Sequence, residues 1–163
     1  MIKKSLKKSS TWLILLAIFF GGQAWINRDM ASGTAPTIQA QTLAGDSFHL
    51  DQLKGKPAIV YFWASWCGIC RTMESSISEL SQEKPLISIA MQSGDKQEVL
   101  DYIEKKTLQT PVVNDPSGQL SANYGIKGVP AVFILDKDGN IRYATSGYSP
   151  TWAIRTRLWL AGR

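Results

Sequence analysis

The sequence predicts an α/β fold in which a central mixed β-sheet is flanked by helices. Three observations support this prediction. Apolar strands alternate with amphipathic helices between residues 57 and 103, which is typical of parallel strands joined by helical crossovers. Two strands joined by a tight turn follow at 131–145 and predict an antiparallel hairpin. The 163 residues, 44% of them hydrophobic, suffice for one such domain preceded by a shorter segment.

Residues 1–29 are predicted to be a basic N-terminus followed by a membrane anchor, with the apolar span at about 10–27. Four lysines within residues 3–8 precede an uncharged stretch. As a helix this stretch would be about 28 Å long, which is close to the roughly 30 Å thickness of a bilayer core. This charge distribution predicts a cytoplasmic N-terminus and a domain outside the cytoplasm. A signal peptide cleaved near Ala24 is the alternative, and both interpretations predict export.

The formal net charge of +5 does not predict nucleic-acid binding. Residues 1–30 carry a net charge of +4, which leaves +1 for residues 31–163, where no basic stripe occurs. Because recognition of a phosphate backbone requires clustered Lys and Arg side chains, nucleic acid is not an expected partner.

The next segment is predicted to lead into the domain. Residues 30–36 are small and polar without periodicity, which favours a linker, and the domain is predicted to extend over 37–163. Two short apolar stretches at 38–43 and 47–50 flank a Gly-Asp turn and predict a hairpin. A helical turn is expected at 51–54.

The strongest local pattern is a buried strand that leads directly into a pair of cysteines. The strand is predicted to begin at Pro57 and to end at Ala64, just before Trp-Cys-Gly-Ile-Cys at 66–70. A helix over 67–83 follows, because apolar residues recur there at helical spacing and proline is absent. These apolar positions are Cys70, Met73, Ile77 and Leu80.

The remaining elements continue the alternation. Residues 86–90 predict a second buried strand, and Asp95 with Glu98 forms a capping box that opens the next helix. A short strand near 111–113 and a short helix at 116–124 follow.

The C-terminal part is predicted to be a hairpin followed by a helix. Strands at 131–135 and 141–145 are joined by an Asp- and Gly-containing turn. Ser149 is the expected N-cap of the last helix, and Pro150 its first residue. Trp152 and Trp159 lie at helical spacing and are expected in the core.

Cys67 and Cys70 are the only cysteines and predict a redox-active pair. Attack on a disulfide requires a thiolate, whereas a cysteine with the unperturbed pKa of about 8.5 is mostly protonated at neutral pH. Unpaired backbone N–H groups at the start of a helix stabilise negative charge, so Cys67 is predicted to be the nucleophile. Cys70 lies one turn further on the buried face and is predicted to resolve the mixed disulfide.

Other uses of a Cys-x-x-Cys pair fit less well. A c-type haem site requires a histidine where Arg71 stands, and a structural zinc requires four ligands although His49 is the only histidine. A passive disulfide closing so short a loop would stabilise the fold only slightly. Copper(I) accepts two thiolates, so a copper-binding module remains an alternative function.

Three motifs resemble those of the thioredoxin fold: Tyr61–Cys70 with its cysteine pair, Tyr124–Ala131 with its Val-Pro step, and Asp138-Gly139. The leading hairpin and the exported context resemble the TlpA-like branch, and within it the suppressor for copper sensitivity D (ScsD)-like subgroup of membrane-linked protein disulfide oxidoreductases. The resemblance covers about residues 37–160. It implies a thioredoxin-like fold with an N-terminal hairpin extension and thiol–disulfide exchange as the activity.

The resemblance also implies a substrate groove beside Cys67. The Val129–Pro130 peptide bond is expected to be cis, although a proline there could simply open a strand. Cis geometry would leave the Val129 backbone free to pair with an extended substrate. Trp66 is expected to line this groove, with partial burial as a packing aromatic as the alternative. Gly68 and Ile69 are expected to tune the reduction potential.

One position departs from the thioredoxin pattern. Thioredoxins carry a buried aspartate six residues before the attacking cysteine, and Tyr61 stands there in this chain. Glu74, four residues after Cys70, is a possible proton relay in its place, with a solvated helix residue as the alternative interpretation.

The sequence therefore predicts a single-pass inner-membrane enzyme whose periplasmic domain exchanges disulfides with cysteine-containing exported proteins. A membrane thiol carrier is expected to donate or accept its electrons, and neither a cofactor nor a metal is expected. The alternatives are a copper(I)-binding module and a partner in cytochrome c maturation. The sequence does not predict the direction of exchange. The direction depends on the reduction potential, and a small difference in thiolate stabilisation changes that potential: about 1.4 kcal/mol corresponds to about 30 mV.

Overall fold

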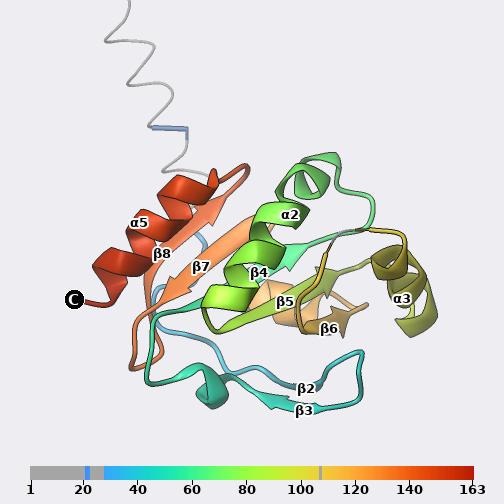
Figure 1. The fold of residues 1–163 in the computed structure, drawn as a ribbon, viewed down its shortest axis with the longest axis horizontal. Coiled ribbons are helices and arrows are strands. Elements are labelled where there is room, and N and C mark those ends of the chain that lie inside the picture. The colour runs from blue at the N-terminus through green and yellow to red at the C-terminus, as the bar shows by residue number, and fades with distance from the viewer. Residues whose placement is uncertain (1–20, 23–27, 107) are drawn as a thin grey trace, which may run out of the picture.

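A computed structural model describes residues 21–22, 28–106 and 108–163, and its main feature is a six-stranded mixed sheet in the order β1-β8-β7-β4-β5-β6 (Figure 1). The predicted apolar span at 10–27 lies almost entirely outside these residues. Within the described ranges, no helix is long and apolar enough to cross a bilayer. The strands of the sheet are β1 (Gly33–Thr34), β4 (Ala58–Trp63), β5 (Leu86–Met91), β6 (Val112–Asp115), β7 (Ala131–Leu135) and β8 (Asn140–Ser146).

Strand β4 lies in the interior of the sheet between β7 and β5, and all six of its residues are buried. It pairs parallel with β5 and antiparallel with β7, and β8 in turn pairs antiparallel with β7. Successive side chains of a strand point to opposite faces, so β4 contributes to two cores. Ile59, Tyr61 and Trp63 enter one core, whereas Ala58, Val60 and Phe62 enter the other.

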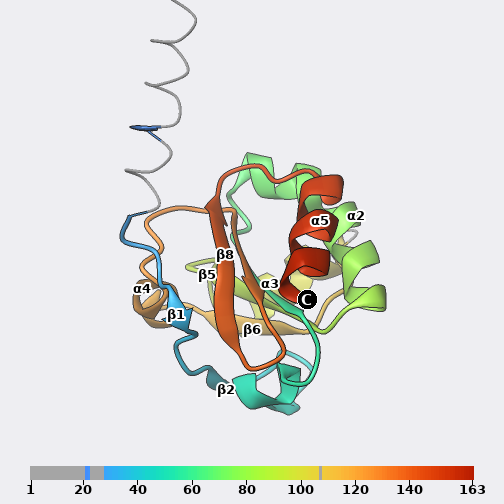
Figure 2. The same cartoon turned by 90° about the vertical axis from the view of Figure 1, so that its left-hand side faces the viewer.

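The two faces of the sheet are covered by different layers (Figures 1 and 2). Helices α2 (Gly68–Glu83), α3 (Lys96–Glu104) and α5 (Thr151–Ala161) contribute side chains to the core on the Trp63 side. The opposite core receives side chains from the β2–β3 hairpin, from η1 and from the segment around α4. Their bounds are Gln39–Gln41 for β2, Ser47–His49 for β3, Leu50–Leu53 for η1 and Gln119–Asn123 for α4.

The predicted elements between residues 38 and 161 are confirmed, with small shifts at their ends. The capping box of α3 is complete, since Asp95 accepts from the Glu98 amide and Glu98 accepts from the Asp95 amide. The last helix begins one residue later than predicted, with Pro150 rather than Ser149 at the N-cap position.

The prediction that Trp152 and Trp159 belong to the core is wrong. Their exposed fractions are 72% and 56%, because Ile154 and Leu158 form the face of α5 that packs on the sheet. The helical spacing of the two tryptophans places them on one face of α5, but this face points to solvent and not to the sheet.

Residues 30–36 are not a free linker. Met30 and Ala35 are buried, and β1 pairs with β8, placing Gly33 opposite Ile141. The packed part of the domain therefore begins at about residue 28 rather than at residue 37.

Candidate active site

Cys67 lies at the junction between β4 and α2, where the chain turns from the central strand into the helix. Its amide donates to the Ala64 carbonyl (3.1 Å), which closes this turn. Cys67 is the N-cap residue of α2, and its Sγ accepts from the Cys70 amide at 3.1 Å. A free backbone donor of the first helical turn thus points at this sulfur, as the sequence predicted.

Cys67 and Cys70 are joined by a disulfide, with their Cα atoms 5.3 Å apart. Cys67 retains 6% of its surface exposed, whereas Cys70 retains 1%. An incoming sulfur can therefore approach Cys67 more directly than Cys70.

The loop that precedes β7 covers the other side of the disulfide. The Val129–Pro130 peptide bond is cis, in agreement with the expectation, and the Val129 carbonyl oxygen lies 3.5 Å from Cys67 Sγ. Val129 is half-buried and Pro130 is buried. Two segments separated by 62 positions in the sequence thus meet at one sulfur atom.

Trp66 and Ile69 border the disulfide on the solvent side, with exposed fractions of 58% and 52%, and Gly68 between them is exposed as well. The Trp66 indole Nε1 donates to the Gln92 carbonyl at 3.0 Å. Trp66 is therefore held at the rim by a hydrogen bond rather than by burial.

The loop after β5 supports this rim. Gln92 has a φ of 45°, and it is the non-glycine residue with positive φ among the described residues. Its neighbour Ser93 accepts from the Ser65 amide at 3.0 Å through Oγ. Sequence reasoning missed both residues, because neither a left-handed glutamine nor its contact with a segment 26 positions away leaves a pattern in the sequence.

Glu74 is buried behind the disulfide, with 5% of its surface exposed, so the solvated interpretation of this residue is wrong. Its Oε1 accepts from the Tyr102 hydroxyl at 2.6 Å. The Tyr102 ring stacks on Trp63 with ring centroids 5.4 Å apart. The Tyr61 hydroxyl is buried on this side of the sheet without a partner among the described residues.

Both tyrosine hydroxyls of this cluster stay protonated. Burial, followed by the hydrogen bond to Glu74 and its charge, raises the pKa of Tyr102 far above its usual value. Burial, followed by the charge of Glu74, does the same to the pKa of Tyr61. The Tyr102 hydroxyl therefore donates to Glu74, whereas the Tyr61 hydroxyl stays protonated without a partner among the described residues. Tyr102 also escaped sequence reasoning, because α3 carries no motif linking it to the cysteines.

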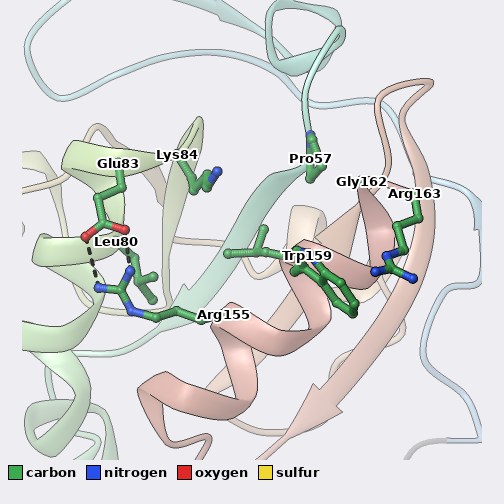
Figure 3. Close-up of a pocket in the computed structure, with 9 residues that line it drawn as sticks. Pro57, Leu80, Glu83, Lys84, Arg155, Trp159, Gly162 and Arg163 are labelled. Carbon is green, nitrogen blue, oxygen red and sulfur yellow. Dashed lines mark hydrogen bonds and ion pairs between the residues drawn. The ribbon is translucent and has the colours of Figure 1, made fainter.

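A hollow of about 510 Å³ lies away from the disulfide, between the C-terminal half of α2 and α5 (Figure 3). Arg155 crosses it to pair with Glu79 and Glu83, and the Arg163 guanidinium stacks on Trp159, 3.6 Å from the ring centroid. It holds no cysteine, and its acidic side chains are engaged by Arg155. Throughout the part of the chain with described placement, no three His, Cys, Asp or Glu side chains gather in the manner of a metal site.

Comparison with known proteins gives one family match and several relatives. The family model described as the AhpC/TSA family matches residues 32–144. A thioredoxin-like protein of Haemophilus influenzae is 31% identical over 162 residues, which cover 98% of this chain and 96% of that protein. The thiol-disulfide oxidoreductase ResA of Bacillus thuringiensis is 30% identical over 111 residues, covering 66% of this chain and 64% of the relative.

Solved structures give the same fold. A putative thiol:disulfide interchange protein DsbE from Chlorobium tepidum superposes with a TM-score of 0.73 at 23% identity, covering 81% of this chain and 98% of the other. The fold is therefore thioredoxin-like, with a central mixed sheet flanked by helices.

Proposed function

The chain belongs to the AhpC/TSA family, and on this premise we propose that it is a protein thiol–disulfide oxidoreductase acting through Cys67 and Cys70. The observation that carries the proposal is the Cys67 sulfur at the start of α2, which accepts a hydrogen bond from the Cys70 amide and belongs to a less deeply buried residue than Cys70. Within this family, the ScsD-like subgroup is our finer assignment, based on the motifs and the N-terminal segment.

The proposed exchange proceeds in two displacements. In the reducing direction, the Cys67 thiolate attacks a substrate disulfide, forms a mixed disulfide and releases one substrate thiolate. The Cys70 thiolate then attacks Cys67 Sγ, releases the second substrate thiolate and leaves the Cys67–Cys70 disulfide. Two electrons pass from the enzyme to the substrate, and the opposite sequence oxidises a substrate dithiol.

The substrate segment is proposed to lie beside the Val129–Pro130 loop. The Val129 carbonyl is 3.5 Å from Cys67 Sγ, so a strand paired with this backbone would carry its own cysteine to the attacking atom. Trp66, Gly68 and Ile69 would border the other side of this groove, where all three are exposed.

Glu74 is proposed to manage the proton of Cys70. It follows Cys70 by four residues, so both side chains lie on the same face of α2. Its burial and its hydrogen bond to Tyr102 hold the carboxylate behind the disulfide, where a water molecule would relay the proton.

The enzyme is proposed to be held at the inner membrane by residues 10–27, with the domain in the periplasm. The lysines and the apolar span of the first 29 residues support this placement. Cysteine-containing exported proteins and a membrane thiol carrier would then be its partners.

Trapping of partners tests the proposed roles of the two cysteines. Cys70→Ser should accumulate mixed disulfides with partner proteins on non-reducing gels, because nothing resolves the bond at Cys67. Cys67→Ser should trap none. Trapping through Cys70 alone would overturn the assignment.

A further inference from the structure

Residues 28–36, here called the N-terminal strap, are fixed to the domain at both ends and in the middle. Asp29 pairs with Lys127, and the Ala31 amide donates to the Tyr124 carbonyl at 3.0 Å. The Pro36 carbonyl accepts from the Tyr124 hydroxyl at 2.8 Å. These contacts fix the path of the strap across the domain.

The fit at the start of the strap is close. A Cβ on Gly125 would lie 1.8 Å from the Asp29 carbonyl oxygen, so only glycine allows the two backbones to approach in this way. A hollow of about 210 Å³ is lined by Met30 together with Gly128 and Ala131, the residues that flank Val129–Pro130. The strap therefore begins on the loop that contacts Cys67 from the other side.

The directions of the strands also place the start of the strap near the disulfide. β4 runs toward the disulfide, β8 is parallel to β4 because each pairs antiparallel with β7, and β1 is antiparallel to β8. β1 thus runs away from the disulfide. The residues before β1 therefore lie at the end of the sheet that carries Cys67, here called the catalytic edge. In Figure 2, the blue segment leading into β1 starts at the end of the molecule where α2 begins.

Large apolar side chains are exposed at this edge. Trp66 and Ile69 border the disulfide, and Tyr148, 60% exposed, follows Gly147, whose amide donates to the Pro130 carbonyl at 2.8 Å. Trp and Tyr side chains are enriched where proteins meet the membrane–water interface.

We propose that the strap turns the catalytic edge toward the membrane, so that Cys67 exchanges disulfides with cysteines of membrane proteins lying close to the bilayer surface. This inference rests on the proposed anchor at residues 10–27. A free seven-residue linker would let the domain move by up to about 25 Å at roughly 3.5 Å per residue. A bound strap removes this freedom and leaves the domain beside the end of the anchor.

Energy transfer from a single label to acceptor lipids tests the orientation in the full-length chain reconstituted in phospholipid vesicles. Both native cysteines are replaced by serine, and one cysteine is introduced at the catalytic edge (Tyr148→Cys) or at the opposite edge (Asp138→Cys, in the β7–β8 turn). Transfer from position 148 should exceed transfer from position 138 by at least about twofold, because a domain of this size is roughly 35 Å across. Equal transfer, or more from position 138, would overturn the inference.

A flexible insertion provides the matched control. About 40 Gly and Ser residues between Asn27 and Arg28, with an r.m.s. length of roughly 35 Å, should abolish the difference between the two labels. The same residues added after Arg163 should leave it intact. Vesicle flotation separates the two proposals: failure to float with the lipid contradicts the anchor, whereas flotation without a preferred orientation contradicts only the role of the strap.

Discussion

At the scale of single residues, the site combines a sulfur at the start of a helix with a carboxylate buried one helical turn beyond the second cysteine. The position of the thioredoxin aspartate is occupied by Tyr61, whose raised pKa keeps its hydroxyl protonated and unable to take a proton from Cys70. Glu74 can take that part because α2 presents it on the Cys70 face and Tyr102 holds it. In our proposal, the carboxylate that takes the proton therefore lies on helix α2 rather than on strand β4.

Glu74→Gln tests this relocation. Glutamine keeps the shape and an acceptor for Tyr102 but cannot take a proton, so resolution of the mixed disulfide should slow by about 100-fold, the low end of general acid–base contributions. The measurement is the rate of resolution as a function of pH. The variant's rate should rise steadily with pH as hydroxide replaces the missing base.

Tyr102→Phe is the matched control, since it removes the hydroxyl bound to Glu74 but retains the ring that stacks on Trp63. It should slow resolution far less than Glu74→Gln does, because the carboxylate that takes the proton is still present. A Glu74→Gln profile that matches the wild-type profile would show that Glu74 serves packing only.

At the scale of elements, the loop after β5 positions the rim of the site. Gln92 adopts the left-handed conformation, which costs a non-glycine residue about 1–2 kcal/mol, and its carbonyl holds the Trp66 indole. A costly conformation kept beside a catalytic disulfide is consistent with a positioning role.

Gln92→Gly should therefore raise the free energy of unfolding by up to about 1 kcal/mol while the Trp66 contact with the backbone is retained. Gln97→Gly, the same substitution within α3, should lower it by about 0.5–1 kcal/mol. Urea denaturation measures both. Effects of the same sign would show that residue 92 carries no backbone strain.

The strap is the second element with a measurable consequence. The hydrogen bond from Lys127 lowers the pKa of Asp29 from its ordinary value of 3.8. A carboxyl whose pKa is lowered on folding stabilises the fold above its unfolded pKa, and this contribution is lost as the pH falls through the folded value.

Asp29→Asn should therefore reduce the free energy of unfolding at neutral pH, and the difference from the wild type should disappear as the pH falls below 3.8. Unfolding curves at several pH values measure it. In a Lys127→Met background the same substitution should have a smaller effect, because only the Arg28 pair at 3.5 Å then remains. A difference that persists in acid would show that the pair does not hold the strap.

At the scale of the whole molecule, the sequence predicts what depends on local patterns. The strand before the cysteines, the helix after them and the capping box of α3 all follow from periodicity and end signals within a few residues. For the same reason the position of Cys67 at the start of α2 was predictable.

Features that depend on tertiary contacts were not predictable from local patterns. The composition of residues 30–36 is that of a linker, yet β8 offers a free edge with which β1 pairs. Trp152 and Trp159 have the spacing of core residues, but Ile154 and Leu158 occupy the buried face of α5. The bond between Tyr102 and Glu74 joins residues 28 positions apart on different helices.

Titration of the two thiols in the reduced protein tests the central claim most directly. Thiolate absorbance in the Cys70→Ser variant should give Cys67 a pKa clearly below the value of about 8.5 for a free cysteine, because the first turn of α2 stabilises the anion. Alkylation at neutral pH should modify Cys67 faster than Cys70. A pKa of about 8.5 or higher at Cys67, with equal and slow alkylation of both thiols, would contradict the account.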